Sequence, residues 1–254
     1  MDRATMGVGP PVCSTRMRFD RPATDPMRGM SFLRRGFARR CTVCALAPGD
    51  PICAPCELDF FDPTSHRCRR CALVTGSHAG ELCGRCLAEP PSFDQTLTLA
   101  DYRAPVDGMV AALKFSARLS LAVFFGRLLA RRETESASAE KVVVPVPLAF
   151  EREKERGFNQ SHEIARVYAR AARLRLAPRM LIRTRHTAAQ QTLALDERRR
   201  NVRGAFAMAG ALEARHVIVV DDVMTSGSTL DEVARTLRAA GAESVVNRIV
   251  ARTP

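Results

Sequence analysis

Four Cys-x2-Cys pairs lie between residues 41 and 86, and no other sequence feature constrains the fold of this chain as strongly. Eight, eleven and eleven residues separate successive pairs. The cysteines are Cys41, Cys44, Cys53, Cys56, Cys68, Cys71, Cys83 and Cys86. Two such pairs supply the four thiolates of one tetrahedral Zn²⁺ ion, a closed shell typical of structural sites. The segment has few apolar residues, so we expect two structural zinc ions to replace a hydrophobic core there.

The sequence leaves the pairing of these cysteines open. We expect adjacent pairing, with the cysteines of residues 41–56 on one zinc ion and those of residues 68–86 on the other. The alternative is a crossed pairing, which joins the first pair with the third and the second with the fourth. Four regularly placed pairs argue against a redox Cys-x2-Cys motif, which needs one pair beside a βαβ unit. Cys13 is the ninth cysteine, and we expect it to be an exposed thiol without a role.

The distribution of glycine, proline and cysteine predicts three segments. Residues 1–35 contain many Gly, Pro and Arg residues without periodicity, which indicates a flexible tail, and Met30 is one of several alternative start positions near it. Residues 36–90 form the expected double zinc ribbon. Residues 91–254 alternate strand and helix patterns, which is typical of an α/β domain with a parallel sheet and crossover helices.

Composition indicates a globular chain with anionic partners. Hydrophobic residues make up 46% of the sequence, and no apolar stretch approaches the ~18 residues of a membrane span, so we expect a cytoplasmic protein without membrane insertion. The net charge of +12 favours nucleic acid or phosphorylated small molecules as partners. Only three of the 39 basic residues are lysines, however, and the arginines are spread along the chain, so charge alone marks no binding face.

Periodicity predicts the elements of the α/β domain. We expect strands at 93–102, 141–146, 179–183, 205–208, 216–220 and 244–250, and helices at 106–115, 119–132, 161–174 and 229–240. In the last helix the apolar residues Leu230, Val233, Ala234, Leu237 and Ala240 form one stripe.

The segment VIVVDDVMTSGST, residues 217–229, is the strongest candidate for a ligand site. It joins a buried strand to a helix, and in an open α/β sheet ligands bind at the carboxyl ends of strands. Backbone N–H groups, hydroxyls and the positive end of a helix suit a phosphate. These groups come from Thr225, Ser226, Gly227, Ser228 and Thr229. The carboxylates of Asp221 and Asp222 suit the hydroxyls of a ribose or a Mg²⁺ ion that they hold. Together the two halves predict a site for a ribose 5-phosphate.

The same segment resembles the thirteen-residue phosphoribosyl pyrophosphate (PRPP) motif of type I phosphoribosyltransferases. More narrowly, residues 41–254 are similar to the ComF (ComFC) family, which is associated with bacterial competence. Besides the cysteine pairs, the similarity rests on LKF at 113–115, PVPL at 145–148, RGFNQS at 156–161 and the spaced residues Thr187, Gln190, Leu193, Arg198, Asn201, Val202, Ala205 and Phe206. Ser226 stands where a threonine is usual, and it keeps the hydroxyl.

This resemblance implies a type I phosphoribosyltransferase fold and a PRPP site that works with Mg²⁺. It implies that Asp221 and Asp222 contact the ribose hydroxyls and that the 225–229 loop holds the 5-phosphate. The turn Pro145, Val146 and Pro147 would approach the pyrophosphate. Further candidates for pyrophosphate or acceptor contacts are Lys114, Arg152, Arg156, Asn159, Gln160, Arg185 and Arg198, of which Arg156 and Arg185 join the acidic pair as catalytic candidates. Residues 184–195 would form a mobile hood that excludes water.

Three functions are compatible with these features. The first is a Mg²⁺- and PRPP-dependent phosphoribosyltransferase, a glycosyl-transferring enzyme of nucleotide metabolism whose acceptor is open. The second is a non-catalytic ribose-phosphate-binding protein that acts on single-stranded DNA with competence proteins. An aromatic content of 6% argues against this function, because single-strand binders stack bases on aromatic side chains. The third is a zinc scaffold with a vestigial transferase fold, which the intact acidic pair disfavours.

Overall fold

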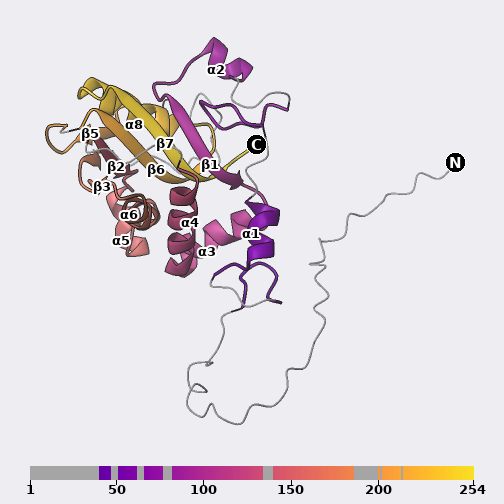
Figure 1. Cartoon of the computed structure of the whole chain (residues 1–254). Coiled ribbons are helices and arrows are strands. Elements are labelled where there is room, and N and C mark those ends of the chain that lie inside the picture. The colour runs from indigo at the N-terminus through magenta and orange to yellow at the C-terminus, as the bar shows by residue number, and fades with distance from the viewer. Residues whose placement is uncertain are drawn as a thin grey trace, which may run out of the picture. The chain divides into compact units, whose positions relative to one another are not determined.

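The computed structural model describes residues 40–46, 51–61, 66–76, 82–133, 140–185, 200, 202–212 and 214–254. Figure 1 labels its elements. The chain divides into two compact units, Met1–Leu58 and Asp59–Pro254. The predicted tail and Cys13 lie outside the described residues. The predicted division at residue 90 stays a prediction. No helix in the described ranges has the length and apolarity needed to cross a membrane.

The second unit contains a five-stranded sheet in the order β1-β7-β6-β2-β3. Its strands are β1 (Gln95–Asp101), β7 (Ser244–Arg252), β6 (His216–Met224), β2 (Lys141–Pro145) and β3 (Arg175–Leu176). Every neighbouring pair is parallel, which confirms the predicted α/β class. A separate antiparallel pair is formed by β4 (Leu181–Arg183) and β5 (Phe206–Met208).

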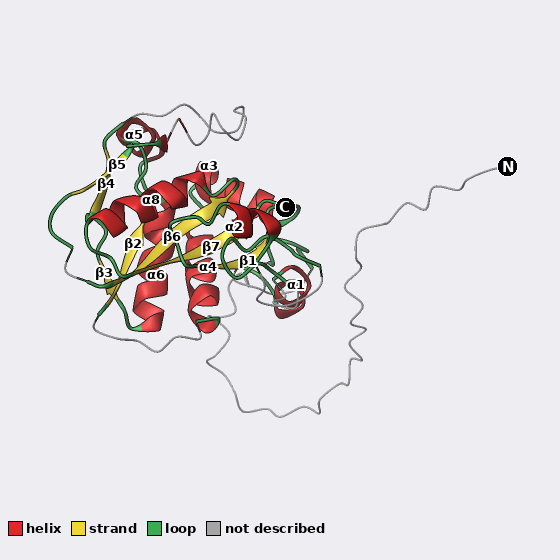
Figure 2. Cartoon of the chain, turned by 90° about the horizontal axis from the view of Figure 1, so that it is seen from above, coloured by secondary structure: helices red, strands yellow, loops and turns green. Residues whose placement is uncertain are grey.

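Helices cover both faces of this sheet. Those of the second unit are α2 (Gly84–Ala88), α3 (Val106–Ser116), α4 (Leu119–Arg131), α5 (Phe150–Arg156), α6 (Gln160–Ala172) and α8 (Ser228–Ala239), and α1 (Ala54–Phe60) spans the boundary between the units. Helices α4 and α6 pack together on one face, and α8 packs on the other, as Figure 2 shows. The predicted helices are confirmed to within one or two residues at most ends, whereas α5 and the two-residue β3 were not predicted.

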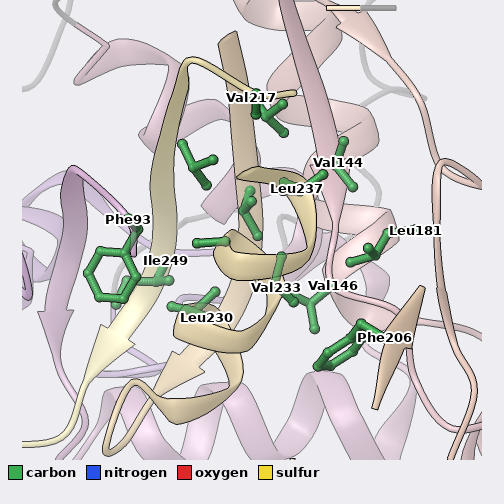
Figure 3. Packing of buried hydrophobic residues seen from close by; sticks show 14 of the residues in the cluster. Phe93, Val144, Val146, Leu181, Phe206, Val217, Leu230, Val233, Leu237 and Ile249 are labelled. Atoms are coloured by element: carbon green, nitrogen blue, oxygen red, sulfur yellow. The ribbon is translucent and has the colours of Figure 1, made fainter. Parts of the chain in front are cut away.

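The main hydrophobic core lies between α8 and the sheet (Figure 3). The predicted stripe of α8 supplies Leu230, Val233, Ala234 and Leu237, none more than 1% exposed. The sheet contributes valines from β2, β6 and β7. These strands are covered on both faces, and strands of this kind have continuous apolar runs in their sequences. The apolar stripe of α8 is therefore buried against the sheet, as its amphipathic pattern predicts.

Strand β6 is longer than predicted, and this corrects the placement of the acidic pair. The sequence predicts that the strand ends at Val220, before the two aspartates, but β6 runs to Met224. The reason is that β7 continues to Arg252 and pairs with β6 out to its last residue, Met224. Asp221 and Asp222 are therefore held within the strand rather than in the loop that follows it.

Candidate functional site

The strand order places a topological switch point, the position of the ligand crevice in α/β proteins, at the carboxyl ends of β2 and β6. These two strands are neighbours, with Pro145 opposite Val220. The chain leaves β2 toward α6 on one face of the sheet and leaves β6 into α8 on the other. Neighbouring strands whose following helices lie on opposite faces leave space between their ends, where α/β proteins bind ligands. The predicted site segment lies at this point.

The acidic pair is ordered by hydrogen bonds and burial. Asp221 Oδ1 accepts hydrogen bonds from Ser161 Oγ at 2.8 Å and from the backbone N–H of Asp222 at 2.9 Å. Burial and the neighbouring charge of Asp222 raise the pKa of Asp221 to about 7, although Ser161 and Lys114 act in the opposite direction. Asp221 therefore gains or loses a proton near neutral pH.

Lys114 completes this group of charges. Its Nζ lies 2.9 Å from Oδ2 of Asp222, whose side chain is 6% exposed. The lysine comes from the end of α3, far from the aspartates in sequence. The structure thus brings together two of the residues that the family resemblance implied.

The 225–229 loop makes a tight turn into α8. Ser226 Oγ and Ser228 Oγ are 2.9 Å apart, and both side chains are buried. Gly227 has φ of +84°, a left-handed conformation, and a Cβ there would lie 2.6 Å from Cε of Met224. A glycine is therefore required at this position, at the N-terminus of a twelve-residue helix.

Two arginines, Arg156 and Arg183, interact electrostatically with the acidic pair. The guanidinium of Arg156 lies 5.5 Å from the ring centroid of Phe115 and donates to Gln160 Oε1. Burial lowers the pKa of Arg156, and the charge of Asp222 opposes this shift. Burial also lowers the pKa of Arg183, helped by the charge of Arg152 and opposed by Asp221. Of the candidates, Arg156 thus lies within electrostatic range of Asp222, and Arg152 lies within range of Arg156 and Arg183.

Two other candidates have structural partners. Asn159 caps α6, since its Oδ1 accepts from the N–H of Ser161 at 2.9 Å, and its Nδ2 donates to the carbonyl of Val146 at 3.0 Å. Val146 is 5% exposed and belongs to the core, between Pro145 and Pro147. These contacts tie the turn after β2 to the start of α6 and so fix one wall of the crevice.

The hood is the least described part of the predicted site. Residues 186–199, including Arg198, lie outside the described residues. Arg185 is exposed, and its Nη1 donates to the carbonyl of Arg203 at 3.3 Å. The catalytic role expected for Arg185 stays a prediction.

Two residues of the site, Ser161 and Arg183, have no role predicted from the sequence. Ser161 donates to Asp221, and Arg183 lies over the ring of Phe206 at 5.5 Å. Ser161 is the last residue of the RGFNQS string, and this string is the sequence signal that could have identified it as a site residue. Arg183 belongs to a run of arginines in which nothing distinguishes one from another.

A cavity of about 540 Å³ adjoins the 225–229 loop. It is bordered by Ser226, Gly227 and Ser228, by one side of α8 and by α2. Its charged lining residues are Arg85, Glu89, Arg200, Arg203, Asp231, Glu232 and Arg235. The acidic pair is not part of its lining.

The eight paired cysteines form two clusters. The first cluster is Cys41, Cys44, Cys53 and Cys56, and the second cluster is Cys68, Cys71, Cys83 and Cys86. Within each, the sulfur atoms lie within 4.8 Å of one another. The structure therefore has the adjacent pairing and not the crossed one.

Both clusters fit a zinc ion. Tetrahedral thiolates at a Zn–S distance of ~2.3 Å are about 3.8 Å apart. Cys44 Sγ and Cys53 Sγ are separated by 3.8 Å, and Cys71 Sγ and Cys83 Sγ by 3.6 Å. Burial opposes ionisation of Cys68, but the backbone N–H groups of Cys71, Cys83 and Arg70 outweigh it and lower the pKa of this thiol to about 7. Each donor set thus has the geometry of a structural site.

Comparison with known proteins identifies the family. The phosphoribosyl transferase domain model matches residues 139–251. DNA utilization protein YhgH of Escherichia coli O6:H1 is 37% identical over 192 residues, 73% of this chain and 84% of the relative. Competence protein F of Haemophilus influenzae is 30% identical over 76% of this chain and 87% of the relative. Competence protein ComFC of Bacillus subtilis is 24% identical over 80% of this chain and 84% of the relative. From these matches, and from a parallel sheet preceded by two clusters of four cysteines each, the chain belongs to the ComF family and has a phosphoribosyltransferase fold.

Proposed function

We propose that this chain binds PRPP with Mg²⁺ and transfers its phosphoribosyl group to a nitrogen-containing acceptor. The observation that carries this proposal is the position of the acidic pair directly before the 225–229 loop, at the carboxyl end of β6. Carboxylate acceptors on one side and backbone N–H and hydroxyl donors on the other match the diol and the phosphate of a ribose 5-phosphate.

Each group of the site has a defined task in this proposal. Asp221 and Asp222 accept hydrogen bonds from the two ribose hydroxyls, and Lys114 holds the Asp222 carboxylate in place at 2.9 Å. The 225–229 loop binds the 5-phosphate at the positive end of α8. The ribose ring is then held at both ends, which orients its C1 atom toward the rest of the crevice.

Transfer displaces pyrophosphate from C1. The acceptor nitrogen forms a bond to C1 while the bond from C1 to the pyrophosphate oxygen breaks, the pyrophosphate leaves with the electron pair, and the nitrogen loses a proton to solvent. Arg152, Arg156 and Arg183 supply positive charge toward the leaving group. The carboxylate oxygens are donors that suit Mg²⁺. When bound, the ion neutralises negative charge on the pyrophosphate.

A calorimetric titration of PRPP and Mg²⁺ into zinc-loaded protein tests the proposal. We expect the wild type to bind and a variant with Asp221→Asn and Asp222→Asn to lose affinity by about 100-fold, as expected when two buried charge-assisted contacts are lost. Asp107→Asn in α3 is a control that changes one carboxylate elsewhere. Absence of pyrophosphate release with nucleobases, amines and ammonia would count against transfer, and absence of PRPP binding would overturn the proposal.

A second candidate function is the handling of single-stranded DNA in the cytoplasm, together with DNA-uptake proteins. The names of the relatives favour it, as do two exposed aromatic residues near the arginines. Phe115 is 76% exposed and lies against Arg156, and Phe150 at the start of α5 is 75% exposed. Aromatic faces beside cations are typical of proteins that stack and hold single-stranded bases.

Binding of a labelled oligonucleotide at increasing salt tests this candidate. We expect binding that weakens steeply with salt, because each phosphate contact releases counterions. Phe115→Ala is expected to weaken binding roughly tenfold, as loss of one stacked base does. Leu119→Ala is the control, since Leu119 is also exposed but offers no ring. No binding at low salt would exclude a direct role.

A further inference from the structure

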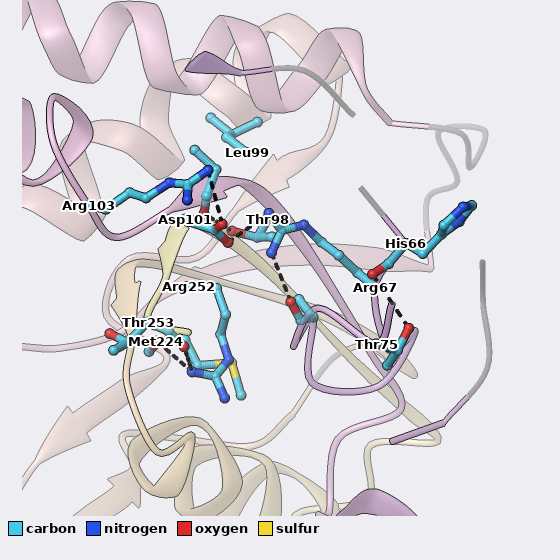
Figure 4. Close-up of polar contacts among 12 residues, drawn as sticks. His66, Arg67, Thr75, Thr98, Leu99, Asp101, Arg103, Met224, Arg252 and Thr253 are labelled. Carbon is cyan, nitrogen blue, oxygen red and sulfur yellow. Dashed lines mark hydrogen bonds and ion pairs between the residues drawn. The ribbon is translucent and has the colours of Figure 1, made fainter. Parts of the chain in front are cut away.

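Two arginines connect the second cluster to the 225–229 loop. Arg252, at the end of β7, is 4% exposed. Its Nε donates to the carbonyl of Cys71 at 2.9 Å, and its Nη1 donates to the carbonyls of Met224 at 3.2 Å and Thr225 at 2.5 Å. Figure 4 shows Arg252 beside Met224 and Thr253. One buried side chain thus links a cysteine of the cluster to the start of the loop.

The second arginine belongs to the cluster itself. Arg85 lies between Cys83 and Cys86 in α2, and its Nη2 donates to the carbonyl of Ser226 at 2.5 Å. Together, Arg85 and Arg252 bind three successive carbonyls, those of residues 224, 225 and 226. The guanidinium groups of Arg85 and Arg252 therefore lie on the side toward which these three carbonyls point.

This arrangement determines where the loop's N–H groups point. In a planar trans peptide the C=O and N–H bonds point in opposite directions. Because the carbonyls of Thr225 and Ser226 face the arginines, the N–H groups of Ser226 and Gly227 face away from them. Successive N–H groups that point to one side form a site for an anion, and two positive charges behind the loop raise its attraction for a phosphate.

We propose that Arg85 and Arg252 are positioning residues for the 225–229 loop, and that through them metal binding at the second cluster and ribose-phosphate binding at the loop strengthen each other. The inference rests on the proposed ribose-phosphate site. Metal at the second cluster fixes the backbone that carries Cys71 and Arg85, which in turn fixes the guanidinium groups on the loop carbonyls. Because coupling between two sites is reciprocal, a ligand in the loop must also hold the metal more tightly.

The experiment measures ligand affinity and the effect of the ligand on zinc release in the full zinc-loaded chain, with ribose 5-phosphate as the probe. Calorimetry gives its affinity, and a chelating dye gives the rate of zinc release with and without it. A Cys44→Ser variant identifies which phase of release belongs to the first cluster. We expect ribose 5-phosphate to slow release from the second cluster by roughly 5-fold or more, a usual size for coupled sites. Release from the first cluster is expected to stay unchanged.

Arg85→Gln is the deciding variant. Arg85 is exposed, so this substitution is expected to leave the fold intact. We expect it to weaken ribose 5-phosphate binding about tenfold and to remove the effect of the ligand on zinc release, as loss of a charged hydrogen-bond partner does. Arg69→Gln is the matched control, because Arg69 is an exposed arginine in the opposite Cys-x2-Cys pair of the same cluster. Arg252→Lys, where it folds, should act like Arg85→Gln.

The outcomes separate this inference from the proposed function. If the wild type binds ribose 5-phosphate and Arg85→Gln binds it equally well, or if the ligand leaves zinc release unchanged, the inference is overturned while the ribose-phosphate site stands. If the coupling is observed but no acceptor supports pyrophosphate release from PRPP, the inference stands and the proposed transfer fails. Absence of ribose 5-phosphate binding to the wild type overturns both.

Discussion

The two cysteine clusters share a donor set but differ in their surroundings. In the first unit, the buried residues among those described are the cysteines Cys41, Cys53 and Cys56 with Pro51 and Ile52. In the second unit, three of the four cysteines belong to the same buried cluster as the strands and α8. The same sequence motif therefore forms a small module built around its cysteines in one place and a part of a domain core in the other.

This difference teaches that the spacing of cysteines predicts a metal site but not its structural context. The small number of buried apolar residues around the first cluster is consistent with the expectation that metal replaces a core there. The second cluster shares the core with Phe93 and Met224, and hydrogen bonds of Arg252 link it to the backbone of the candidate site. Metal at the second cluster is therefore expected to stabilise the sheet unit as well as the ribbon.

Serine substitutions in the two clusters test the comparison most strongly. We expect Cys71→Ser to release one zinc ion and abolish the cooperative thermal unfolding of the second unit, because structural zinc contributes ~10–16 kcal/mol, as much as the stability of a typical domain. Cys44→Ser is expected to release one zinc ion and leave that transition in place. Metal analysis and scanning calorimetry measure both effects, and equal loss of the transition in both variants would contradict the distinction.

A buried ion pair tests whether the second unit also has stability that does not depend on metal. Glu133 accepts hydrogen bonds from Nε and Nη2 of Arg248, both at 2.8 Å, and from the hydroxyl of Tyr168. We expect Glu133→Gln to reduce the free energy of unfolding by about 3–5 kcal/mol, since it leaves a buried charge uncompensated. The urea midpoint measures this change.

The control is Glu163→Gln, which breaks the more exposed pair with Arg166 and should cost ~0–1 kcal/mol. Both variants are expected to keep two zinc ions per chain. Loss of zinc from the second cluster in Glu133→Gln would mean that the cluster depends on the whole core.

The pH dependence of ribose 5-phosphate binding separates the acidic pair from the metal clusters. Burial and Asp222 raise the pKa of Asp221 to about 7, so this carboxyl is protonated below that pH and ionised above it. The ionised form is the better acceptor for ribose hydroxyls. Affinity is therefore expected to rise about tenfold per pH unit below 7 and to level off above it.

Calorimetry between pH 6 and 8, with zinc content checked at each pH, measures this profile. Asp221→Asn should retain only the titration of the ligand's phosphate, whose pKa is about 6. An identical profile in wild type and Asp221→Asn would show that this carboxyl does not control binding.

The smallest expected effect comes from substitution of Ser161, whose hydroxyl contacts the acidic pair. Its hydroxyl donates to Asp221 and stabilises the ionised form. We expect Ser161→Ala to raise the pKa of Asp221 further and to move the midpoint of the binding profile upward by about one pH unit, or ~1.4 kcal/mol. Ser161→Thr should restore the wild-type midpoint, and a downward shift in Ser161→Ala would contradict the assignment.

Much of the fold was predictable because its signals are local. Apolar runs located β2, β6 and β7, and the stripe on α8 was correct except that Ala240 lies just beyond the helix. The end of β6 was not predictable, because the strand continues past the aspartates only where β7 supplies main-chain partners. The charged helix α5 has no apolar stripe, and none of its residues is buried.

The site was predictable to the extent that its residues are adjacent in sequence. Asp221, Asp222 and the 225–229 loop form one continuous segment. Lys114 was implied by family resemblance alone, since its partner lies more than a hundred positions away. The roles of Ser161, Arg85 and Arg252 depend on tertiary contacts, and an arginine-rich sequence gives no sign of which arginines make them.

The strand order has a consequence for how the protein is made. The two strands β7 and β6, which stand between β1 and β2 in the order β1-β7-β6-β2-β3, come last in the chain. During synthesis at ~5–20 residues per second, β1 emerges long before β7, its neighbour in the sheet. The cysteines of both clusters emerge earlier still, so metal can be captured while the sheet is incomplete. A nascent chain that stops before residue 216 leaves β1 as an unpaired edge, the form most exposed to aggregation and to chaperones.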